Sequence, residues 1–189
     1  MTVAEIFAEI NAHMIEGIML HDQFAEYYDF LNLHGFKRCH EYHAMCEFSK
    51  RRGLIRYYVN HYNKLLPENA AKNPEAIPTS WRGYTRQEVD ASTKKRAIRD
   101  GFNRWCEWET ETKKLYEKAY TNLMELGEVA AACKVGELVK DVDQELKKAS
   151  RKQAELASTD YDLAAIYLCQ PDMHEKYKKK SKHIGVKMC

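Results

Sequence analysis

Apolar residues recur at spacings of three and four along most of the chain, which is the period of an amphipathic α-helix. The first such stretch predicts a helix from about Val3 to Leu33, with His34-Gly35 as its stop. One side of this helix is expected to face a core, and its members are Val3, Phe7, Ile10, Met14, Ile18, His21, Ala25 and Tyr28. Because His21 lies within this apolar side, its imidazole is expected in the interior.

A second helix is predicted from about Phe36 to Leu66. Its later half has a regular apolar side, formed by Phe48, Ile55, Val59, Tyr62 and Leu66. Extended toward the N-terminus by helical spacing, this side reaches Ala44 and Glu41, with His40 and Glu47 nearer its edge. The pattern therefore predicts that the carboxylate of Glu41 points inward.

The next segment, residues 67–84, contains Pro67, Pro74 and Pro78 and is predicted to be a loop. So long a connection without secondary structure is uncommon in a compact domain. A crossover along the length of a helical bundle would account for it, because it joins two helices that run parallel instead of forming a hairpin.

A third helix is predicted to begin at Thr85 and Glu88, which have the spacing of a capping box, and to continue to Leu126. Its inward side is predicted to consist of Ala91, Ile98, Phe102, Trp105, Glu109, Thr112, Tyr116 and Leu123. A fourth helix is predicted from about Glu128 to Ala157. The inward residues of this fourth helix are expected to be Val135, Val139, Val142, Leu146 and Ala149.

These elements predict an all-α fold in which residues 1–158 form a four-helix bundle with a long crossover between its second and third helices. Residues 159–189 are predicted to add a short helix through Leu168 and a lysine-rich tail. Pro171 is expected to open a last short helix in this tail, because proline is favoured at a first helical position. A chain of 189 residues suits one domain with a substantial core.

The charge of the chain is unevenly distributed. The net charge is +2, yet residues 171–189 carry six lysines against Asp172 and Glu175, so the other 170 residues carry a net charge of −2. Nucleic-acid binding is therefore not expected of the body, and only the basic tail is suited to it.

A cytoplasmic protein is expected from three further features. No run approaches 18 apolar residues, so no membrane span is expected, and the N-terminus lacks the pattern of a signal peptide. The six cysteines form no Cys-x-x-Cys pair, which favours free thiols in a reducing compartment.

Glu109 is the strongest chemical signal, because it places a carboxylate between Trp105 and Thr112 in the middle of an apolar helical side. A buried carboxylate is costly unless it is paired, protonated or bound to a cation. His21 has a similar position on the first helix, and Glu145 flanks the inward side of the fourth. Carboxylates and imidazoles that converge from several helices suit iron or manganese.

Two simpler interpretations remain open beside a metal site. Glu109 could pair with Arg51, and His21 could be a hydrogen-bonded histidine of the core. Glu47, Asp143 and Glu145 would then be solvated side chains at the flanks of their helices.

Several segments resemble the ferritin-like superfamily. The stretch from Ile10 to Glu16 is similar to the opening helix of ferritins, and the proline-rich connection is similar to their long crossover. The quartet from Glu47 to Lys50 stands where the family carries Glu-x-x-His. The segment that begins at Trp108-Glu109 resembles the third helix, and the acidic segment that contains Glu145 resembles the fourth.

The resemblance implies a carboxylate site for iron, or for manganese as an alternative, in a protein that forms homo-oligomers. The predicted ligands are Glu109, Glu145, Glu47 and His21. Lys50 and Lys148 depart from the family pattern, because they stand where its second and fourth helices offer histidines, and an ammonium has no lone pair for a cation.

Two functions are consequently predicted as alternatives. The first is a protein that binds iron or a similar divalent metal in its core, with oxidase activity as an additional expectation. The second is a non-enzymatic helical scaffold or interaction protein in which Lys50 and Lys148 neutralise the carboxylates of a metal-free site.

Overall fold

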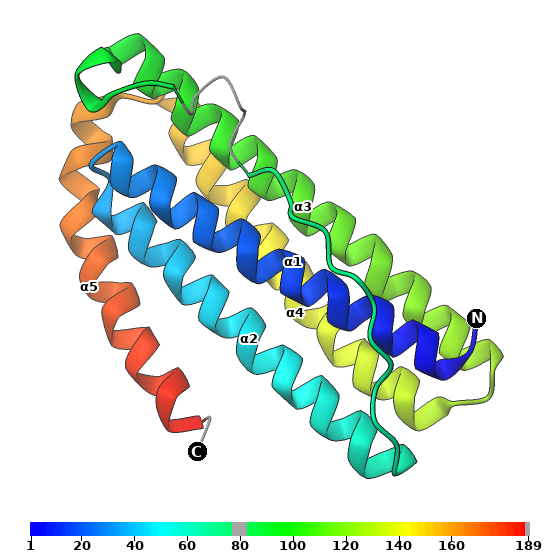
Figure 1. The fold of residues 1–189 in the computed structure, drawn as a ribbon. Helices are drawn as coiled ribbons and strands as arrows, with labels where there is room; N and C mark the ends of the chain where they lie inside the picture. The colour runs from blue at the N-terminus through cyan, green and yellow to red at the C-terminus, as the bar shows by residue number, and fades with distance from the viewer. Residues whose placement is uncertain (77–82, 188–189) are drawn as a thin grey trace.

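The computed structural model describes residues 1–76 and 83–187, with side chains as far as Ile184. Within these residues the protein is all-helical and contains no strand (Figure 1). The α-helices are α1 (Val3–Phe30), α2 (His34–Tyr62), α3 (Ala91–Glu125), α4 (Val129–Ser158) and α5 (Leu163–Lys187). A single 3-10 turn, Arg86–Glu88, precedes α3.

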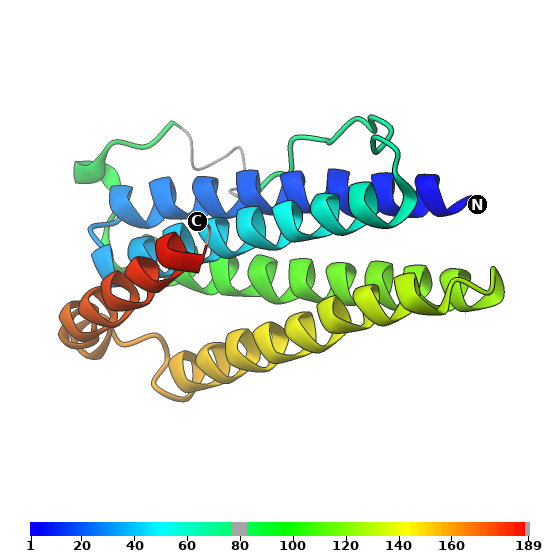
Figure 2. The same ribbon diagram turned by 90° about the horizontal axis from the view of Figure 1, so that it is seen from below.

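The helices α1 to α4 lie side by side along a common direction, and α5 folds back along the outside of α2 (Figures 1 and 2). α1 pairs with α2, α3 pairs with α4, and α1 also touches α3. The chain after α2 returns along the outer side of α1, so α2 and α3 run in the same direction (Figure 1). This arrangement agrees with the predicted crossover, of which residues 77–82 lie outside the described residues.

Side chains of α1 hold the described part of the crossover. The amide of Gln23 donates to the carbonyl of Pro74 at 2.7 Å and accepts from the backbone of Ala76 at 3.1 Å. The carboxylate of Glu16 accepts from the backbone N–H of Lys72 at 2.7 Å. These bonds give the extended backbone partners that it lacks within its own segment.

The first helix ends earlier than its apolar pattern predicts. Asn32 adopts a left-handed backbone with φ of 58°, and the N–H of Leu33 bonds to the carbonyl of Tyr28 at 2.8 Å. Asparagine tolerates this conformation better than most residues, so it ends α1. The predicted stop at His34-Gly35 is therefore wrong, because both residues belong to the first turn of α2.

The capping box of Thr85 and Glu88 is present, but it does not begin the third helix. It closes the 3-10 turn, and α3 starts afresh at Ala91 with Asp90 as its N-cap. The carboxylate of Asp90 accepts from the N–H of Thr93 at 2.7 Å. Ala91 is consequently exposed, although the predicted inward residues of α3 from Ile98 to Leu123 are buried.

The inward face of α2 differs from the predicted one. Phe48 is 40% exposed, and Glu41 pairs with Arg38 at 2.7 Å away from the core. The side chains of α2 that are buried belong to Phe36, Cys39, His40, His43, Ala44, Leu54 and Tyr58. The apolar pattern was misleading here because the true inward face carries histidines in its first half.

The C-terminal segment forms one 25-residue helix with Pro171 inside it, and not two short helices. Proline costs about 3 kcal/mol in a helix interior, because it lacks an N–H and its ring crowds the preceding turn. Packing on α2 offsets this cost, since Ile166, Gln170 and Ser181 of α5 are all buried. The boundary at residue 158 coincides with the end of α4, and the division into two parts remains a prediction.

Gln170 connects α5 to the start of α2. No side chain of α2 itself caps its N-terminus. The Oε1 atom of Gln170 accepts from the backbone N–H groups of Gly35 and Phe36 at 2.9 and 3.1 Å. Only glycine fits at position 35, because a Cβ there would lie 2.6 Å from the carbonyl oxygen of Gln170. The helix α5 thus supplies a cap that α2 lacks.

The apolar core is divided into two clusters along the bundle axis. One lies near the α1–α2 turn and includes Phe24, Tyr28, Phe36, Phe102 and Trp105. The other lies toward the opposite end and includes Ile6, Ile10, Met14, Leu54, Tyr116 and Leu123. Between the two clusters lies a polar band, which includes Glu47, Lys50, Glu109, Glu145 and Lys148. None of the described helices has the length and apolar character that crossing a membrane requires.

Candidate functional site

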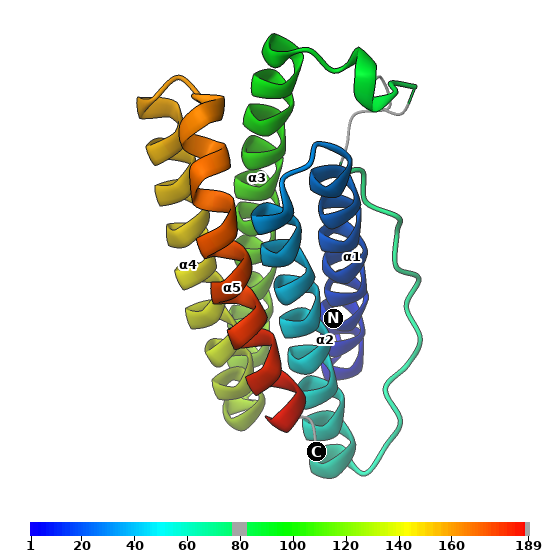
Figure 3. The same ribbon diagram turned by 90° about the vertical axis from the view of Figure 1, so that its left-hand side faces the viewer.

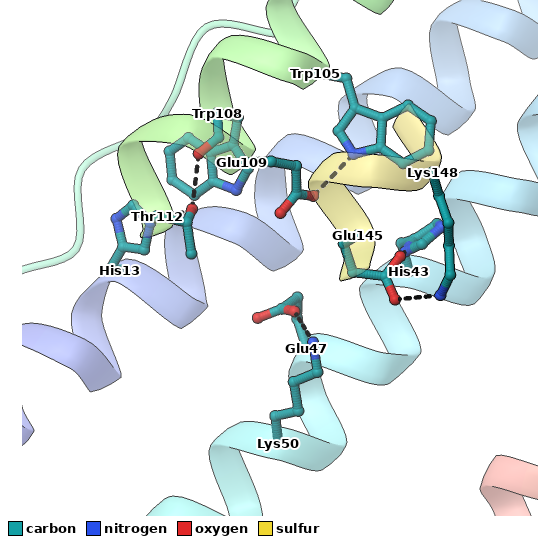
Figure 4. Close-up of polar contacts among 10 residues, drawn as sticks. All are labelled: His13, His43, Glu47, Lys50, Trp105, Trp108, Glu109, Thr112, Glu145 and Lys148. Carbon is teal, nitrogen blue, oxygen red and sulfur yellow. Dashed lines mark hydrogen bonds and ion pairs between the residues drawn. The ribbon is translucent and has the colours of Figure 1, made fainter. Parts of the chain in front are cut away.

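The polar band contains one carboxylate from each of three helices: Glu47 of α2, Glu109 of α3 and Glu145 of α4 (Figure 4). A cavity of about 10 Å³ lies beside Glu47 and Glu109, and His21, Gly17 and Lys50 also line it. This volume is about enough for one water molecule or one small ion. Three of the four predicted ligands, Glu47, Glu109 and His21, line this cavity, whereas Glu145 does not.

Glu109 is buried in the middle of α3, as predicted, and is 6% exposed. The indole N–H of Trp105 donates to its Oε1 atom at 2.9 Å. Burial, followed by the negative charge of Glu47, raises the pKa of Glu109 to about 8. At neutral pH the folded protein therefore holds this side chain mostly as the neutral acid.

Lys50 supplies a cation inside the polar band. Its ammonium lies 3.0 Å from the Oε1 atom of Glu47, one helical turn away (Figure 4). Burial alone would lower the pKa of Lys50, but the charge of Glu47 and its hydrogen bond outweigh this effect and raise the pKa. The lysine consequently remains charged and neutralises Glu47.

Arg51 does not take part in the site. Its Nε–H donates to the Oδ1 atom of Asn11 at 2.8 Å. The alternative in which Arg51 pairs with Glu109 is therefore wrong, because Arg51 bonds to Asn11.

Glu145 lies at the edge of the polar band. Lys148 pairs with its Oε1 atom at 2.9 Å, and the Nδ1 atom of His43 lies 3.5 Å from its Oε2 atom (Figure 4). Burial, followed by the positive charge of neighbouring groups, lowers the pKa of His43 well below its usual value. Because His43 is neutral, Lys148 supplies the main countercharge to this carboxylate.

His21 and His40 form a buried pair of imidazoles. Their Nδ1 atoms lie 3.0 Å apart. One nitrogen must donate and the other accept, so the two rings hold opposite tautomers. Burial lowers the pKa of both well below its usual value. His21 is thus a hydrogen-bonded histidine of the core, which is one of the two interpretations that its sequence position allowed.

His40 and His43 lie on a face of α2 other than the apolar side that was predicted to face inward, and their spacing in the sequence indicates this face. Both residues and Glu47 have the spacing of one helical face, and this face also carries Phe36. Their burial among aromatic rings confirms that the face turns inward, with His43 5.2 Å from Trp105 between ring centroids.

The first helix brings no carboxylate to the cavity. Gly17 faces it, whereas Glu16 turns outward and lies 3.7 Å from His13. The Nε2 atom of His13 bonds to the hydroxyl of Thr112 at 2.7 Å, and its ring stacks on Trp108 (Figure 4). The first helix therefore contributes His21 to the cavity, but no carboxylate.

Replacing Gly17 with alanine is expected to stabilise the protein. A Cβ at this position would meet the ring of Trp108 at 3.5 Å and Glu47 at 3.7 Å, which are ordinary contacts. Alanine favours a helix interior by about 1 kcal/mol over glycine, so the free energy of unfolding should rise by up to that amount. Urea denaturation measures the change.

Gly101→Ala is the matched control for this substitution, because Gly101 is also a buried helical glycine. A Cβ there would lie 2.5 Å from the hydroxyl of Tyr28, so this variant should be less stable than the parent. Equal effects of the two substitutions would contradict the described packing around the cavity.

The donor groups of the polar band are already paired or protonated. Within the described residues, no three side chains of His, Cys, Asp or Glu are grouped so that they could hold a metal ion. Lys50 and Lys148 pair with two of the carboxylates, and the third is mostly protonated. The five cysteines described are free thiols.

No protein-family model matches the chain, and no curated protein matches it in sequence. Solved structures share its fold. An open-pore ferritin from the hyperthermophilic archaeon Archaeoglobus fulgidus and an engineered closed form of that ferritin each match with a TM-score of 0.75 and 16% identity, over 91% of this chain and 94% of theirs. A PmFTN variant soaked in iron matches with a TM-score of 0.71 and 11% identity, over 89% of this chain and 96% of its own. The chain has a ferritin-like fold.

Proposed function

We propose that this chain is a non-enzymatic interaction protein built on a ferritin-type four-helix bundle of α1 to α4. In this proposal the ammonium of Lys50 stands where a ferritin-like site would hold a cation. The observation that carries it is the ion pair between Lys50 and Glu47 at 3.0 Å, next to the cavity that Glu109 also lines.

The charges of the polar band support this proposal. Lys50 balances Glu47, Lys148 balances Glu145, and Glu109 is mostly neutral. A divalent cation in the cavity would have to share it with the Lys50 ammonium, and Glu109 would have to lose its proton. At pH 7 that deprotonation alone costs about 1.4 kcal/mol for a pKa of about 8.

A divalent metal is the second candidate, with iron preferred and manganese as the alternative. It is supported by the shared cavity of Glu47, Glu109 and His21 and by the fold shared with a protein that was soaked in iron. The ligands would be Glu109, Glu47, Glu145 and His21, and Lys50 would have to swing out of the band. Oxidase activity belongs to this candidate alone, because it needs a bound redox metal.

The substitution Lys50→His separates the two candidates. It removes the ammonium and restores a Glu-x-x-His pair, whose imidazole has a lone pair for a metal. The parent protein is expected to take up much less than one Fe²⁺ or Mn²⁺ per chain, and the variant is expected to take up more. Anaerobic equilibration, desalting and elemental analysis measure the metal content.

Lys140→His is the matched control, because it adds a histidine at an exposed position of α4. Its metal content should equal that of the parent. If the parent itself binds one or more metal ions per chain, and Glu109→Gln abolishes the binding, the second candidate is correct and the first is wrong.

We also propose that the chain associates with copies of itself. Exposed apolar side chains gather around the turn between α3 and α4, namely Tyr120, Met124, Leu126 and Val129. Light scattering after size exclusion should give a multiple of the monomer mass, and Met124→Ser combined with Val129→Ser should reduce it. A monomer at all concentrations would contradict self-association.

A further inference from the structure

A second and larger cavity, of about 470 Å³, lies between α2, α3, α4 and α5. It forms because α4 packs on α3 while α5 packs on α2, and α5 passes between α4 and α2 in the view of Figure 3. Its volume is within the range of sites that bind small organic molecules. Neither the ion pair of Lys50 with Glu47 nor the small cavity beside it forms part of this space.

The inner wall of this cavity is aromatic and uncharged. It is formed by the buried side chains of Phe36, Cys39, His40, His43, Phe102 and Trp105. Burial keeps the two imidazoles neutral, because it lowers the pKa of both. Met173 and Tyr177 of α5 extend the wall outward. Such a surface favours an apolar body over a strongly hydrated one.

The rim of the cavity is cationic. It carries Lys147, Lys148, Arg151 and Lys152 from α4 and Lys176 and Lys180 from α5, against the single carboxylate of Glu155. Three of these six cations already have carboxylate partners, because Lys147 pairs with Asp143, Lys148 with Glu145 and Lys152 with Glu155.

Three rim cations have no ion pair with a carboxylate of the described chain: Arg151, Lys176 and Lys180. The ammonium of Lys180 lies 5.2 Å from the centre of the Tyr177 ring, and that of Lys176 lies 5.5 Å from it. Both ammonium groups therefore lie near the Tyr177 ring, and all three residues line the cavity.

We propose that this cavity binds an amphiphilic carboxylate, such as a medium-chain fatty acid anion. The apolar body would lie against Phe36, Phe102 and Trp105, and the carboxylate would be held at the mouth by Lys176, Lys180 and Arg151. Tight binding requires contact with both the aromatic wall and the cationic rim. A hydrophilic anion without an apolar chain, or an apolar chain without a negative charge, should therefore bind more weakly. The inference does not depend on whether the core carboxylates bind a metal.

The test is a titration of the full chain with dodecanoate below its micelle concentration. Trp105 reports binding through its fluorescence, because it forms part of the wall, and calorimetry gives the stoichiometry. Saturable binding of one dodecanoate per chain is the expected result. Dodecyltrimethylammonium, which has the same chain and the opposite charge, and inorganic phosphate, which has no chain, should bind much more weakly.

The combined substitution Lys176→Gln and Lys180→Gln removes two rim cations at the surface. It should weaken dodecanoate binding by about tenfold or more, since charge-assisted hydrogen bonds are lost. Lys178→Gln combined with Lys182→Gln is the matched control, because these residues have the same spacing on α5 but do not line the cavity. It should leave the affinity unchanged.

Three results would overturn the proposal. They are the absence of saturable dodecanoate binding, equal affinity for the cationic amphiphile or for phosphate, and an equal loss of affinity in the two double variants. The metal content of the same preparations is measured separately, so a failure of this inference is distinguishable from a failure of the proposed function.

Discussion

Replacing Lys50 with methionine is expected to lower the free energy of unfolding by about 1–3 kcal/mol, less than a fully buried ion pair would lose, because the side chains of Lys50 and Glu47 are 22% and 18% exposed. Methionine keeps most of the length and volume of the side chain. The loss would therefore come from Glu47, which would keep its negative charge beside Glu109 without the ammonium that now lies 3.0 Å away. Urea denaturation at pH 7 measures the change.

Two further variants test the cause of this loss. Lys148→Met removes an ammonium that is 57% exposed, so it should cost less than about 1 kcal/mol. Adding Glu47→Gln to Lys50→Met should recover most of the lost stability, because no unpaired charge then remains. If Lys50→Met is as stable as the parent, the ammonium does not hold the core carboxylates, and the proposal of an internal cation fails.

The substitution Glu109→Gln is expected to change how stability depends on pH. The pKa of Glu109 is about 8 in the folded chain and near 4.5 in an unfolded one. Between these values the folded chain binds more protons, so its stability falls as the pH rises through this window and levels off above it. Each pKa unit corresponds to about 1.4 kcal/mol, so the full effect amounts to several kcal/mol.

Glutamine keeps an oxygen to accept the hydrogen bond from Trp105 but does not titrate. Relative to the parent, the variant should therefore gain stability steadily from pH 4.5 to pH 8. The buried histidines do not affect this comparison. Their pKa values are lowered, so the stability that they contribute is present above about pH 6.5 and is lost below it in both proteins.

Glu111→Gln, at a position of α3 that is 57% exposed, is the matched control and should leave the pH dependence unchanged. Urea denaturation of the three proteins at several pH values between 4 and 9 gives the comparison. Parallel curves for the parent and Glu109→Gln would mean that Glu109 ionises normally, and the neutral acid proposed for the core would then be wrong.

The local sequence was sufficient to predict the helices and most of the buried face of α3. The period of three and four predicted helices in all the regions where they occur, because that spacing places apolar residues on one side of a helix whatever its surroundings. The burial of Glu109 followed from its spacing, since a residue four positions after Trp105 and three before Thr112 lies on the same face of the helix as both. The capping box of Thr85 and Glu88 was also correct as local chemistry.

The tertiary structure decided how each helix is rotated about its axis and whether α5 continues through Pro171, neither of which the local pattern determines. Residue spacing defines which side chains share a face, but the rotation of a helix depends on all the faces packed against it. For α2 this rotation buries His40 and His43 and exposes Phe48. The continuity of α5 through Pro171 likewise depends on burial against α2, which offsets the local cost of the proline.

The candidate site was predicted in part for the same reason. Its carboxylates Glu47 and Glu109 were identified, because each lies on or near an apolar helical side in the sequence. The pairing of Lys50 with Glu47, and the bonding of Arg51 to Asn11 and not to Glu109, depend on side-chain directions across α1, α2 and α3. Sequence by itself thus determined the helices and the buried acid, whereas only the packing of helices far apart in the chain decided which charges meet it.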